Sequence, residues 1–161
     1  KSTIDKFKKY IYGEYVVNSQ IIKIISKEIT DGNIIGWFEG RMEFGARALG
    51  NRSILANPRD PQMKSRLNMM IKKREGFRPF APIVHREKQI KYFKYNRLVQ
   101  YMNQVVKVNE EHSKNLPAIT HIDNSARIQT VNEKSNKRFY ELLKEFKKIT
   151  NVPILINTSF I

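Results

Sequence analysis

The sequence predicts one α/β domain built on a mixed, twisted sheet with flanking helices. Apolar runs of strand length, such as 33–38 and 152–156, alternate along the chain with amphipathic segments of helical period, such as 19–31 and 136–150. No internal repeat or low-complexity stretch interrupts this order. With 161 residues, 40% of them hydrophobic, the chain can bury roughly 70% of its unfolded surface.

Each element follows from a local pattern. Helices are expected where apolar residues recur every three or four positions; Asn18 or Ser19 can cap the first helix, Gly32 can end it, and Pro61 suits the first turn of the second. The expected helices are 19–31, 61–71, 87–93 and 136–150. The expected strands are 33–38, 53–56, 80–84, 98–108, 126–131 and 152–156, with a polar loop over 109–115.

Composition excludes several function classes. The chain has no cysteine, which rules out disulfides, thiolate metal sites and a cysteine nucleophile. No Ser–His–Asp or paired-carboxylate arrangement supports a hydrolase. No signal peptide, membrane-spanning run or lipidation motif is present, so we expect a cytoplasmic protein without a membrane partner.

The charge is strongly positive and unevenly placed. The net charge is +15, and residues 41–78 carry ten basic against three acidic side chains. A pI near 10.1 predicts an anionic partner. Lysines elsewhere are scattered, as expected for a solvated surface, so a polynucleotide is not the expected partner.

The first anion-binding candidate is GRMEFGARALGNRS, residues 40–53. It places Arg41, Arg47 and Arg52 among three glycines and one carboxylate, Glu43. Glycine lets backbone approach a ligand, and guanidinium groups match phosphate or carboxylate oxygens. The alternative is a basic surface turn.

A second cationic string, KKREGFRPFAP, spans residues 72–82 and supplies Lys73, Arg74 and Arg78. Together with the three earlier arginines, these side chains predict a site for phosphorylated ligands. About two or three of the six are expected to pair with nearby carboxylates instead, because ion-pair networks imitate functional sites.

Two later strings add polar groups. HIDNSARIQTV (121–131) holds His121 and Asp123, which would share one face if they lay on a strand. The pair lacks the third ligand of a catalytic zinc site, and a structural histidine is the alternative. Asn157, Thr158 and Ser159 follow an apolar strand, where polar groups can bind phosphate or ribose oxygens; a plain turn is the alternative.

These four strings, in this order, resemble the C-terminal domain of the NodU/CmcH-type O-carbamoyltransferases, a YrdC-like domain. The resemblance implies an enzyme that uses ATP and carbamoyl phosphate to form a carbamoyl adenylate. The carbamoyl group then passes to a hydroxyl of a small molecule. It also implies a partner within the same protein, an N-terminal actin-like ATPase-fold domain.

Residue chemistry and, for the wall that holds Arg127, the resemblance predict roles for individual residues. Glu43 is expected to help hold Mg²⁺, or else to orient Arg41 or Arg47. Arg127 is expected to add a phosphate contact in the active-site wall. The expected catalytic residues are Arg47, Lys73, Arg74 and Arg78. The expected substrate- or nucleotide-binding residues are Arg41, Glu43, Arg52, His121, Asp123, Arg127, Asn157 and Ser159.

The expected organisation is a connecting segment over 1–17 and the YrdC-like domain over 18–161. The family continues its last motif with Asn and a Gly-Glu-Pro segment, whereas Ile161 stands in the Asn position here. We therefore expect a domain truncated at its C-terminus that is inactive alone. Two alternatives stay open at this point: a double-stranded RNA-binding module and a non-catalytic anion-binding domain.

Overall fold

The computed structural model describes Gly13 and residues 18–160. Apart from Gly13, the connecting segment expected over 1–17 lies outside the described residues, as does Ile161. The strands are β1 (Ile35–Phe38), β2 (Arg52–Ala56), β3 (Pro82–His85), β4 (Gln104–Lys107), β5 (Ser125–Val131) and β6 (Ile154–Thr158). The helices are α2 (Asn18–Thr30), α3 (Met63–Arg66), η2 (Leu67–Lys72), η3 (Arg86–Lys88), α4 (Gln89–Tyr92), α5 (Glu110–Ser113) and α6 (Lys137–Thr150).

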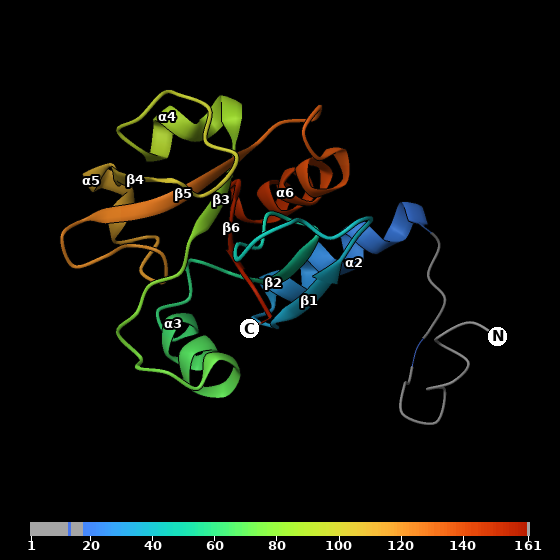
Figure 1. Cartoon of the computed structure of the whole chain (residues 1–161), viewed down its shortest axis with the longest axis horizontal. Coiled ribbons are helices and arrows are strands. Elements are labelled where there is room, and N and C mark those ends of the chain that lie inside the picture. Colours follow the sequence, from blue (N-terminus) through green and yellow to red (C-terminus); the bar gives the residue numbers. More distant parts are fainter. Residues whose placement is uncertain (1–12, 14–17, 161) are drawn as a thin grey trace.

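The six strands form one mixed sheet in the order β1-β2-β6-β3-β5-β4 (Figure 1). Only β3 and β5 pair in parallel; the other neighbours are antiparallel. β6, which follows every other strand in sequence, lies inside the sheet between β2 and β3. The described elements therefore confirm an α/β class with a mixed sheet and flanking helices.

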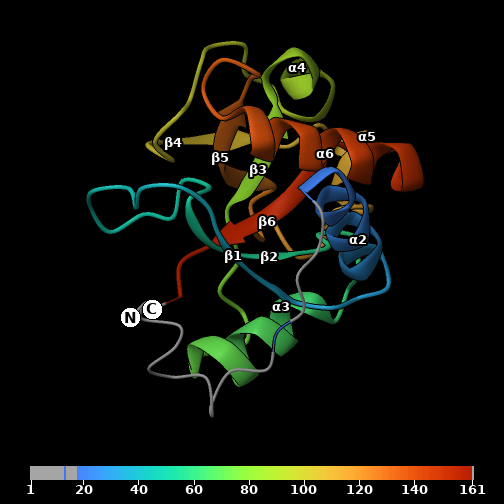
Figure 2. The same cartoon turned by 90° about the vertical axis from the view of Figure 1, so that its right-hand side faces the viewer.

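Each face of the sheet has its own apolar core. Along β6, Leu155 packs in one core, whereas Ile154 and Ile156 pack in the other, as the alternation of a strand requires. Helices α2 and α6 run side by side over the Leu155 face (Figure 2). The opposite face is covered by α3, η2, α4 and the segments on either side of β4, residues 93–99 and 116–119.

The expected long helices are confirmed within one residue at each end. Asn136 caps α6, because its side chain accepts a hydrogen bond from the Phe139 backbone N–H, and Asn151 ends α6 with a positive φ. Gly32 follows α2 with φ +92°. Among the described residues, no helix is long and apolar enough to cross a membrane.

Three expectations need correction. The strand expected over 98–108 exists only as β4, because Met102, with φ +53°, leaves the extended conformation. Glu110 and Glu111 form a short helix, α5, within the expected loop; carboxylates favour a helix N-terminus. The helix expected over 61–71 changes into the π-helix η2 after Arg66.

The GRMEFGARALG string lies in the long connection between β1 and β2, at the end of a strand as expected. A hydrogen bond from Glu39 N–H to the Asn51 carbonyl, 2.9 Å, closes the base of this connection. We call residues 40–51 the arginine loop.

Buried His85 is expected to make the stability of the fold sensitive to acid. Burial lowers the pKa of His85 below 6.5; the Tyr140 carbonyl, 2.9 Å from Nε2, and Glu87 raise it, whereas Lys147 and Lys144 lower it. The unfolded chain therefore binds a proton first, and the free energy of unfolding should fall as pH drops below 6.5.

We expect chemical denaturation to show lower stability at pH 5.5 than at pH 7.5. In His85→Gln the difference between the two pH values should shrink. One proton changes the free energy by at most about 1.4 kcal/mol per pH unit. An unchanged difference in the variant would assign the acid sensitivity to other groups.

Candidate functional site

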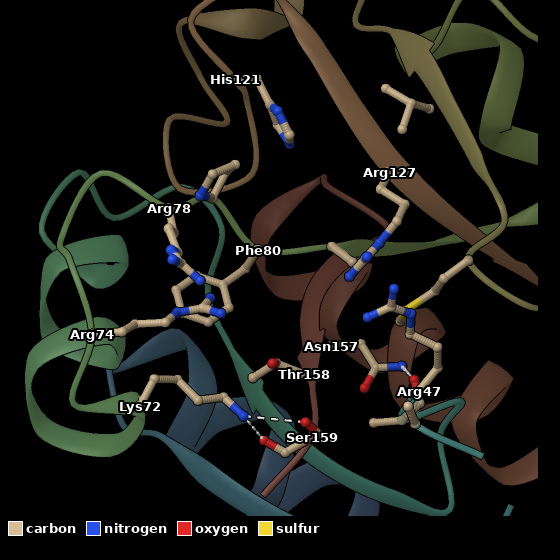
Figure 3. A pocket seen from close by; sticks show the side chains of 16 residues that line it. Arg47, Lys72, Arg74, Arg78, Phe80, His121, Arg127, Asn157, Thr158 and Ser159 are labelled. Carbon is tan, nitrogen blue, oxygen red and sulfur yellow. Dashed lines mark hydrogen bonds between the residues drawn. The ribbon is translucent and has the colours of Figure 1, made fainter. Parts of the chain in front are cut away.

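A cavity of about 590 Å³ opens where the arginine loop, the end of η2 and the end of β6 meet (Figure 3). Its charged side chains are Arg47, Lys72, Arg74, Arg78 and Arg127, with His121 beside them. No carboxylate is among its described lining residues. We call this space the cationic cavity; its remaining lining residues are Ala46, Ala48, Pro79, Phe80, Ala81, Met102, Val105, Asn157, Thr158 and Ser159.

The arginine loop is held closed by its own carboxylate. Oε1 of Glu43 accepts hydrogen bonds from the backbone N–H groups of Leu49 and Asn51, the latter at 3.3 Å. Burial alone would raise the pKa of Glu43, but these backbone hydrogen bonds lower it, so the carboxylate stays ionised. Nε1 of Trp37 donates to the Gly50 carbonyl at 2.9 Å. These contacts fix the backbone that carries Arg47 at the cavity.

Lys72 reaches the cavity from the last position of η2. Its Nζ donates to the backbone carbonyl of Ser159 and to Ser159 Oγ, the latter at 3.2 Å (Figure 3). Lys73, the next residue, has φ +46° and is exposed, outside the cavity lining. The helix end thus directs Lys72 to β6 and leaves Lys73 in solvent.

Asn68, buried in η2, organises the string from Arg74 to Arg78. Its Oδ1 accepts from Arg74 Nε at 2.7 Å, and its Nδ2 donates to the carbonyls of Gly76 and Arg78 at 3.2 and 2.8 Å. The guanidinium of Arg74 lies over the Phe80 ring, 4.9 Å from its centroid. Arg78 is more exposed and forms an ion pair with Glu75 at 2.9 Å.

The cations of the cavity depress one another's pKa values. Burial, then repulsion by Arg74, lowers the pKa of Lys72. Burial, then repulsion by Arg47 and Arg74, lowers the pKa of Arg127. For Arg74 itself, burial and Arg78 lower the pKa, and Glu75 partly opposes them. An anion in the cavity would relieve this repulsion.

His121 is the one titratable group of the described lining with an ordinary pKa near neutrality. Burial lowers the pKa of His121 below 6.5; Asp123 raises it, and Arg127 and Lys64 lower it further. His121 is therefore neutral at pH 7, so it can donate or accept a hydrogen bond.

A buried amide network ties β6 and β5 to the arginine loop. Asn157, 1% exposed, donates from Nδ2 to the Ala48 carbonyl at 3.1 Å and to Gln129 Oε1 at 2.8 Å. Gln129, 4% exposed, donates from Nε2 to the Leu49 carbonyl at 2.8 Å. The network holds residues 48 and 49 against the sheet.

The structure gathers seven of the residues expected at the site around the cationic cavity. They come from the arginine loop, the string after η2, the turn before β5, and β5 and β6 with the residue after it. Their functional roles stay predictions. The seven are Arg47, Arg74, Arg78, His121, Arg127, Asn157 and Ser159.

Five other expected residues, Arg41, Glu43, Arg52, Lys73 and Asp123, do not line the cavity. The carbonyl of Arg41 accepts from the side chain of Asn51, and Arg52 donates to the Gly45 carbonyl at 3.5 Å, so both contribute to the arginine loop.

His121 and Asp123 lie in a turn before β5, not on a strand, and therefore do not share a strand face. Asp123 is exposed, and its carboxylate accepts from Ser125 Oγ at 2.6 Å and from Lys107 Nζ at 3.3 Å. Of the two, His121 alone lines the cavity.

The described residues offer little to a protein-bound metal. They contain no group of three or more His, Asp or Glu side chains that could hold one. Oε1 of Glu43 is engaged by backbone N–H groups, whereas Oε2 is buried without a hydrogen-bond partner among the described residues. Glu43 does not line the cavity, so its position does not fit a Mg²⁺ ligand on phosphates bound there.

Sequence reasoning missed Lys72, Asn68 and Gln129. The choice between Lys72 and Lys73 depends on η2, whose hydrogen bonds run from residue i to i+5 and change the facing of its last turn. Asn68 and Gln129 lie within apolar patterns of a helix and a strand. The signal that could have found Asn68 and Gln129 is a polar residue at a core position, because a buried amide must have hydrogen-bond partners.

Comparison with known proteins agrees with these motifs. The family model "Carbamoyltransferase C-terminus" matches residues 26–161. The nodulation protein NolO of Bradyrhizobium diazoefficiens is 49% identical over 82% of this chain and 25% of its own length. NolNO of Sinorhizobium fredii is 51% identical, over 82% of this chain and 20% of its own length.

A third relative has a chemically explicit name. The 3'-hydroxymethylcephem-O-carbamoyltransferase of Amycolatopsis lactamdurans is 41% identical over 84% of this chain and 25% of its own length. The chain thus spans about a quarter of the length of these relatives. Since the family model covers most of the chain and all four motifs, this chain belongs to the carbamoyltransferase C-terminus family.

Proposed function

We propose that this chain is the part of an O-carbamoyltransferase that forms carbamoyl adenylate from ATP and carbamoyl phosphate. The observation that carries the proposal is the cationic cavity. It brings four arginine side chains and one lysine side chain together, and no carboxylate is among its described lining residues. Both proposed substrates are phosphate anions. Transfer at phosphorus requires mainly positioning and charge stabilisation, which such a cavity can supply.

The cavity also has an apolar side that suits a nucleotide base. Pro79, Phe80, Met102 and Val105 line it together with the cations. Adenine would contact these side chains, while the triphosphate would lie against Arg47, Arg74, Arg127 and their neighbours. A volume of about 590 Å³ is in the range of small-molecule sites.

The proposed reaction has two balanced steps. Water cleaves carbamoyl phosphate to carbamate and phosphate. A carbamate oxygen then attacks the α-phosphorus of ATP, the bond to the β-phosphate oxygen breaks, and pyrophosphate leaves. The cations would stabilise the charge that develops on the phosphoryl oxygens. Mg²⁺ would accompany ATP and screen the charge of its phosphates.

The carbamoyl group would leave the adenylate for a hydroxyl acceptor in another domain. We propose an N-terminal actin-like domain as that partner, because this chain matches only about a quarter of the length of the relatives. The gathering of cations in one cavity supports this enzyme over the RNA-binding alternative, in which cations would spread over a face with exposed aromatic side chains.

The test is pyrophosphate release from ATP, measured with the protein at its natural length. We expect release that requires carbamoyl phosphate and that stops when inorganic phosphate replaces it. Release at the same rate without carbamoyl phosphate, or none with it, would overturn the proposal. Tight duplex RNA binding that resists physiological salt would favour the RNA-binding alternative.

A further inference from the structure

Asn157 lines the cationic cavity and keeps an unpartnered hydrogen-bond acceptor, not a donor. Both hydrogens on its Nδ2 are used, one toward the Ala48 carbonyl and one toward Gln129 Oε1. Its Oδ1 is buried and accepts no hydrogen bond from any described residue. Figure 3 shows a dashed hydrogen bond leaving the amide nitrogen of Asn157, whose partner is the Ala48 carbonyl, and the amide oxygen on the other side.

The orientation of this amide is fixed by the backbone. The Ala48 carbonyl can only accept, so it must face the nitrogen of Asn157. The Leu49 carbonyl likewise faces the nitrogen of Gln129, which leaves Gln129 Oε1 as an acceptor for Asn157. A flipped amide at either position would place two oxygens against each other.

This acceptor differs from its surroundings. Five of the polar side chains that line the cavity are cations, which can only donate, and Ser159 Oγ accepts from Lys72. A phosphate oxygen cannot bind at Oδ1, because both are acceptors. A ligand group that does bind there must carry an N–H or O–H donor and must lie next to an anion.

We propose that Asn157 Oδ1 accepts a hydrogen bond from the –NH₂ of the carbamoyl group and so selects carbamoyl phosphate over other acyl phosphates. The inference rests on the proposed function. The carbamoyl –NH₂ is attached to the carbon that bears the phosphate ester oxygen, so it is held close to the phosphate that the cations bind. The amino group of adenine, by contrast, is at the far end of the nucleotide from its phosphates. A buried acceptor without a donor is costly, and the correct ligand removes that cost.

The experiment compares carbamoyl phosphate with acetyl phosphate, in which a methyl group replaces –NH₂ at equal charge. Binding is measured by stopped-flow fluorescence on the full-length protein, before the acyl phosphate is hydrolysed, with α,β-methylene-ATP present to prevent adenylate formation. We expect the wild-type protein to bind carbamoyl phosphate about tenfold or more tightly than acetyl phosphate. In Asn157→Ala the ratio should fall to about one.

Gln129→Ala is the matched control. It removes a tether of the same network but leaves Asn157 held by the Ala48 carbonyl. Affinity for both phosphates should fall together, with their ratio within about twofold of wild type. A ratio lost equally in both variants would mean that loop position, not the Asn157 oxygen, sets the preference.

The ratio of the wild-type affinities for carbamoyl phosphate and acetyl phosphate tests the inference even if a variant fails to fold. Equal binding of the two acyl phosphates would overturn the role of Asn157 and leave the proposed function standing. No binding of carbamoyl phosphate would overturn both. A second comparison tests the adenine amino group: binding of ATP is compared with binding of purine riboside triphosphate, which lacks that group. If Asn157→Ala abolishes the preference for ATP but keeps the preference for carbamoyl phosphate over acetyl phosphate, the carbamoyl assignment is wrong.

Discussion

Replacing Arg74 by alanine should weaken ATP binding by about 1.5–3 kcal/mol, a factor of about 10–150 in Kd, with the fold retained. Arg74 is a cavity cation whose position is fixed by two contacts. Asn68 holds its Nε at 2.7 Å, and the Phe80 ring supports the guanidinium plane at 4.9 Å. A guanidinium positioned before the ligand arrives loses little entropy on binding. Isothermal titration calorimetry with ATP measures the effect.

Lys73→Ala is the control for Arg74→Ala, since it removes one positive charge from the neighbouring position. Lys73 is exposed and lies outside the cavity lining. The Kd of the Lys73→Ala variant for ATP should therefore differ from the wild-type value by less than about twofold. Comparable losses in both variants would show that overall charge, not the cavity, attracts the nucleotide. Comparing the thermal unfolding of the two variants checks that each remains folded.

Gly50→Ala should destabilise the protein by about 2–5 kcal/mol, the largest loss that we expect from adding one methyl group. Gly50 has φ +111°, and a Cβ there would lie 2.7 Å from Cδ1 of Phe139. Phe139 is fully buried and stacks on Trp37 with centroids 6.1 Å apart, so its ring cannot move freely. The backbone strain and the clash with Phe139 therefore both lower the free energy of unfolding.

Gly45→Ala separates the two contributions to the Gly50 effect. Gly45 has nearly the same backbone angle, φ +106°, but no heavy atom lies within 4 Å of its Cβ position. We expect Gly45→Ala to cost about 1–3 kcal/mol, from backbone strain alone. Urea unfolding gives both free energies. Equal losses at the two positions would mean that Phe139 yields to the new methyl group.

Much of the fold could be predicted because local patterns and tertiary packing agree. The helix α6 has an apolar stripe, a capping asparagine and a second asparagine at its end, so both boundaries follow from the sequence. Alternation failed at 98–103. There the backbone N–H of Val99 donates to the side-chain Oγ1 of Thr130 at 2.9 Å instead of to a backbone carbonyl, while the Val99 carbonyl accepts from the Thr130 N–H at 2.6 Å. No pattern of hydrophobicity encodes this irregular pairing.

The sequence predicted the chemistry of the site better than it predicted which residues line it. Arginine between glycines indicated an anion site, and Arg47 lines the cavity. The same string contains Glu43, Arg41 and Arg52, whose contacts shape the loop itself. Sequence spacing cannot separate these two groups, because the path of the loop decides which side chains face the sheet.

The order of β6 in the sheet has a consequence for how this chain is made. While a ribosome synthesises it, β1 and β2 can pair early, and so can β3, β4 and β5, but each set keeps an open edge where β6 belongs. Only when Ile154–Thr158 leave the exit tunnel can the two half-sheets join. The same five residues include Asn157 and Thr158 of the cavity. A nascent chain therefore exposes two unpaired strand edges until the moment at which it also gains its ligand site, and this interval is when it most needs protection from aggregation.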